Sequence, residues 1–372
     1  MAYSFYDEPI SSNQYFANAP NARTRREAAE FFWKGKVLAE PRPPVDSSES
    51  VLHQIAHPYC PDDSIINRQV VLQSDNRIRK SVRFRFPILS FEKELLDILR
   101  ANTSVPVPRV YNYYRSAEFE HLILEKIPGV TLQEAWPTLK VHERQKIADQ
   151  VVAFLGEIRK LHSPHIKATQ VLREPLRSGI SDALEFNRER FRGFLDNNHI
   201  SAYVTTRTDG LRSLPNVLTH CDLDWSNILI TDDKNVSGII DWECSGYFPS
   251  YWEWLSIKKF TSPVKRTDET WFQMLERRTR PSSDAQEVWQ LEQLHRALEK
   301  HTQSGLAPED RQESRATGWT EVCKILELDS SEPALAGDYA ELAKHPLWLE
   351  VRSDNNTHPI DSTQEDTSSE TV

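Results

Sequence analysis

Two hydrophobic periods divide this 372-residue chain, and the change between them falls near residue 135. Before it, residues 65–72, 77–86 and 121–125 carry the apolar runs and two-residue alternation of β-strands, with a polar turn at residues 73–76 and a helical period at residues 91–100. Helical periods follow at residues 141–162, 181–197, 285–301 and, more weakly, 320–328 and 335–349. The pattern predicts an α+β protein with a small antiparallel-sheet lobe followed by a larger, mostly helical lobe.

A further hairpin pattern, at residues 228–240, is flanked by oxygen-bearing side chains. Asn227 precedes it, Asp241 follows it, and Asp222 lies on the segment just before Asn227. Because a hairpin returns its far end beside its start, Asn227 and Asp241 should lie side by side, with Asp222 on the adjacent loop. Mg²⁺ prefers oxygen ligands, and phosphoryl transfer also needs a group that orients the acceptor hydroxyl. The spacing predicts a phosphoryl-transfer site; the alternative is a surface hairpin with ordinary acidic ends.

The same segment carries a family resemblance. His220, Asp222 and Asn227, followed by Ile-Asp-Trp-Glu at residues 240–243, resemble the aminoglycoside phosphotransferase family, within the kinase-like superfamily that includes choline kinases. The resemblance implies a bilobal protein-kinase-like fold that uses ATP and Mg²⁺ to phosphorylate a hydroxyl group of a small molecule. By this match Asp222 is the catalytic base, His220 is the structural histidine of the catalytic loop, and Asn227 and Asp241 are the metal ligands.

Two shorter segments extend the resemblance into the small lobe. Residues 102–111 and 124–136 are similar to segments of fungal members of the family, in which the second segment is the hinge that meets the adenine ring. By this match the backbone from Glu125 to Ile127 would contact the nucleotide.

The family also places a basic residue on a small-lobe strand, where it touches the phosphates and pairs with a glutamate of the following helix. In this sequence we expect Arg83 or Arg85 in that role, paired with Glu92, with Glu94 as the second choice for the glutamate. An arginine in place of the usual lysine keeps the charge but is bulkier and planar. The alternative is that both arginines line a solvated strand face.

The sequence departs from the family pattern in its glycines. No glycine lies between Gly35 and Gly129, whereas backbone amides that approach a phosphate closely generally need glycine. The turn at residues 73–76, with Ser74 or Asn76, is a candidate substitute. The departure keeps a second hypothesis open, a kinase-fold pseudoenzyme or binding protein with a degenerate ATP site. A protein kinase is disfavoured, because no long peptide-docking segment follows Asp241.

Charge and aromatic content bear on the partner. The formal net charge is −10. The lack of a basic footprint argues against nucleic-acid binding, whereas the negative net charge suits a cationic alcohol as acceptor. Six aromatic residues follow Asp241: Trp242, Tyr247, Phe248, Tyr251, Trp252 and Trp254. They are expected to form core of the large lobe; the alternative is an aromatic acceptor pocket for an ammonium group, with Trp225 as its most exposed member.

Cysteine usage and hydropathy indicate the compartment. The four cysteines show neither a zinc-site spacing nor a disulfide framework, which fits a reducing, cytoplasmic location. No apolar run reaches the length of a transmembrane helix, so no membrane partner is expected.

The organisation expected from these signals has four parts. Residues 1–50 form an N-terminal extension with a short amphipathic helix at residues 24–38 and a linker at residues 43–50. The small nucleotide-binding lobe spans residues 51–135, and the helical catalytic and acceptor lobe spans residues 136–350. Residues 351–372 form an acidic tail that is expected to be disordered.

Overall fold

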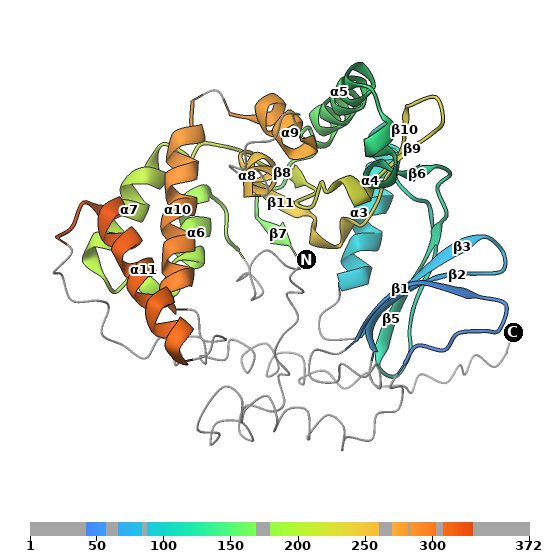
Figure 1. Ribbon diagram of the computed structural model, residues 1–372, viewed down its shortest axis with the longest axis horizontal. Coiled ribbons are helices and arrows are strands. Elements are labelled where there is room, and N and C mark those ends of the chain that lie inside the picture. The colour runs from blue at the N-terminus through green and yellow to red at the C-terminus, as the bar shows by residue number, and fades with distance from the viewer. Residues whose placement is uncertain are drawn as a thin grey trace, which may run out of the picture.

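The protein folds into a small sheet lobe and a larger helical lobe (Figure 1). The computed structural model describes residues 42–56, 66–83, 88–168, 179–259, 270–281, 283–302 and 308–329. The bilobal α+β architecture expected from the sequence is therefore confirmed. Arg85, the expected helix at residues 24–38, the weak helical pattern at residues 335–349 and the acidic tail lie outside the described residues.

The small lobe is built on a five-stranded antiparallel sheet in the order β1-β2-β3-β5-β4. Its strands are β1 (Ser50–Ala56), β2 (Ile66–Leu72), β3 (Arg77–Arg83), β4 (Val110–Arg115) and β5 (Phe119–Glu125). Helix α3 (Ile88–Asn102) connects β3 to β4 and buries Leu95, Leu96 and Leu99. Figure 1 shows α3 between the sheet and the helical lobe, so one face of the sheet looks toward the junction of the two lobes.

The segment expected as a linker, residues 43–50, contacts the small-lobe sheet. The guanidinium group of Arg79, on β3, donates to the carbonyl oxygen of Pro44 and to the Glu49 carboxylate, 3.0 Å away. Pro43 is buried as well. The segment before Ser50 is thus fixed to the sheet by a buried arginine, which its composition of proline, serine and acidic residues did not indicate.

The chain passes from one lobe to the other across a second, three-stranded sheet in the order β10-β9-β6. Strands β9 (Ile228–Ile230) and β10 (Val236–Ile239) form the expected hairpin, and β6 (Val130–Thr131) adds to its edge. The crossing is tight. The Ile127 side chain lies against Gly238, and Gly129, at φ +125°, lies against the carbonyl oxygen of Ile230.

The helical lobe surrounds a third, three-stranded sheet in the order β7-β11-β8. Its strands are β7 (Lys167–Ala168), β8 (Asn216–Thr219) and β11 (Gly246–Pro249). Its helices are α4 (Leu132–Ala135), α5 (Val141–Ile158), α6 (Ala183–Arg190), α7 (Asn198–Asp209), α8 (Trp252–Lys259), α9 (Trp271–Thr279), α10 (Ala285–Thr302) and α11 (Pro308–Leu326). Short 3₁₀ turns are η1 (Trp136–Thr138), η2 (Arg192–Phe194), η3 (Trp225–Asn227) and η4 (Trp242–Cys244). Among the described helices, none is both long and apolar enough to cross a bilayer.

Local signals explain where several helices begin. Asp182 caps α6 and Asn197 caps α7 by accepting hydrogen bonds from backbone amides of the first turn. Thr270 and Gln273 form a reciprocal capping box at the start of α9.

Two apolar cores stabilise the fold. One runs from the small-lobe sheet through α3 and the β9–β10 hairpin to α5 and α9, and the other fills the helical lobe between α6, α7, α8, α10 and α11. The aromatic residues after Asp241 belong to these cores: Trp242, Phe248, Tyr251, Trp252 and Trp254 are at most 2% exposed. The core interpretation is confirmed, and Trp225 is also partly buried, against Trp136.

The interlobe crossing gives a stability prediction. We expect Gly129→Ala to lower the free energy of unfolding by roughly 1–3 kcal/mol, because φ is left-handed there and the added Cβ would lie 2.5 Å from the Ile230 carbonyl oxygen. Gly156→Ala, in α5, is the matched control: nothing lies within 4 Å of its Cβ position, and a gain of about 0.5–1 kcal/mol is expected. Urea unfolding measures both; equal effects of the two substitutions would contradict the prediction.

Candidate active site

His220 directly follows β8 and ties the loop that carries Asp222 to the hairpin. Its ring is fully buried; Nδ1 accepts from the Asp222 amide at 3.2 Å, and Nε2 lies 3.0 Å from the Ile240 carbonyl oxygen. Burial lowers the pKa of His220 to about 4, against the raising effects of that carbonyl and of Asp241. A neutral imidazole with its proton on Nε2 satisfies both contacts at once. His220 therefore positions the loop and holds the segment that leads to Asp241.

Glu253, on α8, fixes the same loop through hydrogen bonds from the loop's backbone amides. Its carboxylate accepts from the amides of His220 at 2.6 Å and Cys221 at 3.2 Å, and the residue is 2% exposed. Cys221 adopts φ +69°, a left-handed backbone conformation. A left-handed non-glycine residue costs energy and persists only when its surroundings fix it. The two hydrogen bonds to Glu253 supply that constraint, a role that the sequence analysis missed.

Asp222 and Asn227 contact each other directly. The Asn227 amide donates to the Asp222 backbone carbonyl at 2.9 Å and to its carboxylate at 3.1 Å. Burial, together with the nearby carboxylates of Asp241 and Asp224, raises the pKa of Asp222 to about 6, although the hydrogen bond from Asn227 opposes this. Asp224 itself accepts from Ser226 as the cap of η3. The carboxylate of Asp222 is thus oriented by its own loop and remains half-buried.

The hairpin brings Asp241 beside Asn227, as the spacing predicted. Ile239 pairs with Ile228, and the Ile240 amide donates to the Asn227 carbonyl oxygen at 3.0 Å. Asp241 then turns out of the strand with φ +64°. Its side chain keeps 34% exposure, so a ligand in the junction between the lobes can reach its carboxylate.

Lys80, on β3, joins Asp241 to the small lobe. Its ammonium group lies 2.9 Å from Glu92, 2.5 Å from Asp241 and 2.8 Å from Glu243. Burial alone lowers the pKa of Lys80, but Asp241, Glu243 and Glu92 raise it, so the pKa lies well above its usual range. Burial raises the pKa of Asp241, but the Lys80 ammonium and the Arg68 guanidinium outweigh it and hold the pKa below its usual range. Burial also raises the pKa of Glu92, to about 7, although Lys80 opposes this.

The cation that pairs with Glu92 is Lys80, which differs from the expectation. The prediction that Arg83 pairs with Glu92 is wrong: Arg83 donates to the Ile66 carbonyl oxygen, reaches Glu118 at 3.3 Å and stacks over Phe119. Arg83 lies on the opposite face of β3 from Lys80, because side chains alternate along a strand. Glu92 is the glutamate of the pair, as expected, with a lysine in the position that had been assigned to an arginine. The overlooked signal is a lone lysine between Ile78 and Val82 on the apolar face of β3.

The turn at residues 73–76 lies away from this cluster. Arg77, directly after the turn, pairs with Glu125 at the hinge end of the sheet, and Lys80 is three residues further, about 10 Å along the strand. Ser74 and Asn76 are therefore poorly placed to cover a phosphate at Lys80. The connection between β1 and β2, at the opposite end of these strands, lies outside the described residues.

The hinge residues have structural contacts of their own. The Glu125 amide donates to the Arg109 carbonyl oxygen at 2.8 Å, and its carboxylate accepts from the Arg109 amide at 3.0 Å. Ile127 packs on Gly238. These contacts fix the position of the backbone at the junction between the lobes.

The donor set suits magnesium rather than a softer metal. Asn227 and Asp241 offer an amide oxygen and a carboxylate, and hard oxygen donors of this kind, few in number, leave positions for phosphate and water. Among the described residues, no group of three or more His, Cys, Asp or Glu side chains is arranged as a closed metal site. The arrangement fits a metal that arrives with a phosphate ligand.

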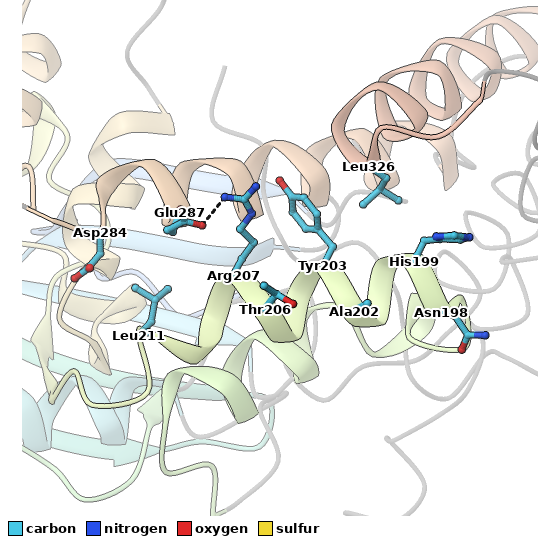
Figure 2. Close-up of a pocket in the computed structure, with 11 residues that line it drawn as sticks. Asn198, His199, Ala202, Tyr203, Thr206, Arg207, Leu211, Asp284, Glu287 and Leu326 are labelled. Carbon is cyan, nitrogen blue, oxygen red and sulfur yellow. Dashed lines mark hydrogen bonds and ion pairs between the residues drawn. The ribbon is translucent and has the colours of Figure 1, made fainter.

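A separate cavity of about 640 Å³ lies between α7 and the helices α10 and α11 (Figure 2). Tyr203 and Arg207 line it from α7, and the Arg207–Glu287 ion pair, at 2.7 Å, bridges one end. None of the residues around Asp222 or Lys80 lines it. It is distinct from the candidate active site.

Comparison with known sequences identifies one family. A sequence profile of the phosphotransferase enzyme family matches residues 61–253, just over half of the chain. Subtelomeric hrmA-associated cluster proteins from two strains of Aspergillus fumigatus are 26% identical over 122 residues, which cover 28% of this chain and 24% of those proteins. The chain thus spans about a quarter of the length of the curated relatives that it matches.

Solved structures of aminoglycoside phosphotransferases are also similar. The ADP-bound enzyme APH(2'')-Ib is 12% identical, with a TM-score of 0.47 over 78% of this chain and 94% of that chain. The enzyme APH(3'')-Id from Streptomyces rimosus, in complex with ADP and streptomycin, is 15% identical, with a TM-score of 0.38 over 70% and 91% of the two chains. At identities this low, the likeness extends to no individual residue or substrate.

The buried carboxyl group of Glu253 leads to a prediction about how stability depends on pH. Burial raises the pKa of Glu253 from 4.5 to about 7, against the hydrogen bond from His220 and the charge of Arg159. The folded state therefore holds this proton more firmly than the unfolded chain, so the stabilisation is full below pH 4.5 and is lost as the pH rises through 7. We expect the stability advantage of the wild type over Glu253→Gln to shrink by on the order of 2 kcal/mol from pH 5 to pH 8. Urea unfolding across that range measures it; a constant difference would contradict the prediction.

Proposed function

Because the chain belongs to the phosphotransferase enzyme family, we propose that it transfers the γ-phosphate of ATP to a hydroxyl group of a small molecule. The observation that carries the proposal is the convergence of Asp222, Asn227, Asp241 and Lys80 at the junction of the lobes. Phosphoryl transfer needs positioning and charge neutralisation more than covalent chemistry. An oriented carboxylate, an amide oxygen, an accessible carboxylate and an ammonium group meet those needs.

Asp222 acts as the catalytic base in this proposal. Its carboxylate is held by the Asn227 amide, while the His220 ring accepts from its backbone amide and Glu253 accepts from the amide of Cys221, just before it. A general base must lie within hydrogen-bond reach of the proton that it accepts. Asp222 would orient the acceptor hydroxyl toward the phosphate and accept its proton, and His220, which is fully buried, supports the loop without touching substrate.

Lys80 would bind the nucleotide phosphates, with Glu92 holding its ammonium group in place. Glu92 is 1% exposed and contacts both Lys80 and the Trp242 amide, so it links α3 to the segment after Asp241. The contact between Lys80 and Asp241 is the one that an arriving nucleotide would rearrange. A phosphate oxygen competes well for an ammonium group, since charge-assisted hydrogen bonds to phosphate are strong.

Asn227 and Asp241 would hold Mg²⁺ through their side-chain oxygens. When bound, the ion neutralises charge on the phosphates and orients them for in-line attack. The backbone between Glu125 and Ile127 would meet the adenine ring at the hinge, where Gly129 and Gly238 allow the close crossing of the chain. The acceptor is proposed to be a small alcohol, and the net charge of −10 favours a cationic one. A screen of ATP consumption across alcohols identifies it.

One observation favours a second candidate, a binding protein that keeps the kinase fold. The absence of glycine between Gly35 and Gly129 removes the usual backbone cradle for phosphates. Titration with ATP, in the presence and absence of Mg²⁺, separates the two functions. Binding that strengthens with Mg²⁺ supports the enzyme, and no binding at millimolar ATP supports the alternative.

The base assignment predicts a large and selective loss. Asp222→Ala should lower kcat by roughly three or more orders of magnitude, as for other essential catalytic groups, with ATP affinity nearly unchanged. Asp232→Ala is the control, because Asp232 is an exposed acid at the turn of the same hairpin. Turnover of an identified alcohol, together with an ATP titration, measures both effects. Unchanged turnover in Asp222→Ala would overturn the assignment.

The revised cation predicts a different loss. Lys80→Met should lower kcat/KM for ATP by about 100-fold or more, because an ammonium group aimed at developing phosphate charge is removed. Arg83→Met removes a cation from the opposite face of the same strand and should leave kcat/KM within a few-fold once the folded fraction is equal. Steady-state kinetics at 25 °C, corrected for folded protein, test the pair; a larger loss in Arg83→Met would restore the original assignment.

A further inference from the structure

Arg68 faces the same junction as Lys80. Strands β2 and β3 pair antiparallel, with Val70 opposite Lys80 and Arg68 opposite Val82. Directly opposed residues share a face of a sheet, and so do residues two apart on one strand. Arg68 and Lys80 are therefore diagonal neighbours on the face that looks toward Asp241.

Contacts to a single carboxylate confirm this placement. Arg68 Nη1 lies 2.5 Å from one oxygen of Glu243, and Lys80 Nζ lies 2.8 Å from the other. The side chains of Arg68, Lys80 and Glu243 are 13%, 7% and 7% exposed. An anionic group is thus held between a guanidinium and an ammonium group, out of bulk water.

A carboxylate bound in this way marks a position that other oxyanions can occupy. Guanidinium groups bind carboxylate and phosphate with the same planar arrangement of donors. The carboxylate of Asp241, 34% exposed, adjoins this position through Lys80. A phosphate that reached Lys80 would therefore meet Arg68 within the same cluster.

The absence of glycine from the segment that forms the five-stranded sheet explains why Arg68 would be needed to bind phosphate. A backbone cradle for phosphate depends on amides that a Cβ does not obstruct, and the whole stretch between Gly35 and Gly129 lacks glycine. A side-chain cation on β2 reaches the phosphates without such close backbone approach.

We propose that Arg68 is a nucleotide-binding residue that contacts a phosphate of the polyphosphate chain, in place of a glycine-rich loop. The proposal rests on the function given above. In the free protein the Glu243 carboxylate occupies this position, and the phosphate displaces it on binding. Glu243 therefore acts as an internal competitor that lowers affinity for nucleotide polyphosphates.

Nucleotide binding tests the proposal without relying on turnover. ATP, ADP and adenosine are titrated into the full chain by calorimetry without Mg²⁺, using wild type, Arg68→Gln, Arg68→Lys and Glu243→Gln. We expect Arg68→Gln to weaken ATP and ADP binding by about 10- to 100-fold, as for loss of a hydrogen bond to a charged group, with adenosine binding unchanged. Arg68→Lys should recover part of the affinity, and Glu243→Gln should bind ATP more tightly than the wild type.

Arg77→Gln is the matched control. Arg77 lies on the opposite face of β3 with 44% of its side chain exposed and pairs with Asp75, so its loss should leave all three affinities unchanged. Equal ATP affinity in wild type and Arg68→Gln would overturn the inference alone. A loss of adenosine binding as large as that of ATP would also overturn it, because that pattern reports disturbed folding. Absence of ATP binding to the wild type would overturn the proposed function, and this inference with it.

Discussion

The rest of the site depends on one buried ammonium group. Lys80 is 7% exposed and contacts carboxylates from α3, from the end of the hairpin and from η4. A buried charge without partners costs several kcal/mol, so each of these contacts is needed to hold the others in place. Lys80 and Asp241 are 161 residues apart in sequence. Their contact is one of several polar links between the sheet lobe and the helical lobe, together with the hydrogen bond from the Trp242 amide to Glu92 and the ion pair of Arg68 with Glu243.

The loop that carries Asp222 is held in a different way, by hydrogen bonds from three consecutive backbone amides. The neutral ring of His220 accepts from the Asp222 amide and donates to the Ile240 carbonyl oxygen, while the Glu253 carboxylate accepts from the two preceding amides, those of His220 and Cys221. Cys221 and Asp241 both adopt left-handed backbone conformations. Such strain is retained when the surroundings fix it, and it is commonly found where a side chain must be aimed. Cys221 directly precedes Asp222, the proposed base, and Asp241 is itself one of the two proposed metal ligands.

Local sequence spacing predicted part of this site well. A hairpin brings its ends together whatever surrounds it, so the adjacency of Asn227 and Asp241 followed from the polar turn between two short apolar runs. The apolar face of α5 was predicted equally well: Ile147, Val151 and Leu155 are buried, as the helical period of apolar residues in this segment required. In the small lobe, strand register mattered more. The alternation of β3 was recognised, but a cation was sought on the wrong face, because Lys80 stood among apolar residues.

By itself, then, the sequence determined the hairpin, the order of its polar residues and the two-lobe division, since each depends on periods and turns within a few residues. The tertiary structure decided which cation meets Glu92, how Arg68 and Glu243 come together, and what holds Cys221 in its left-handed conformation. These outcomes depend on which face of a strand turns inward and on which carboxylate lies across the junction. Pairing between distant segments sets both, and nothing within a short window of residues encodes them.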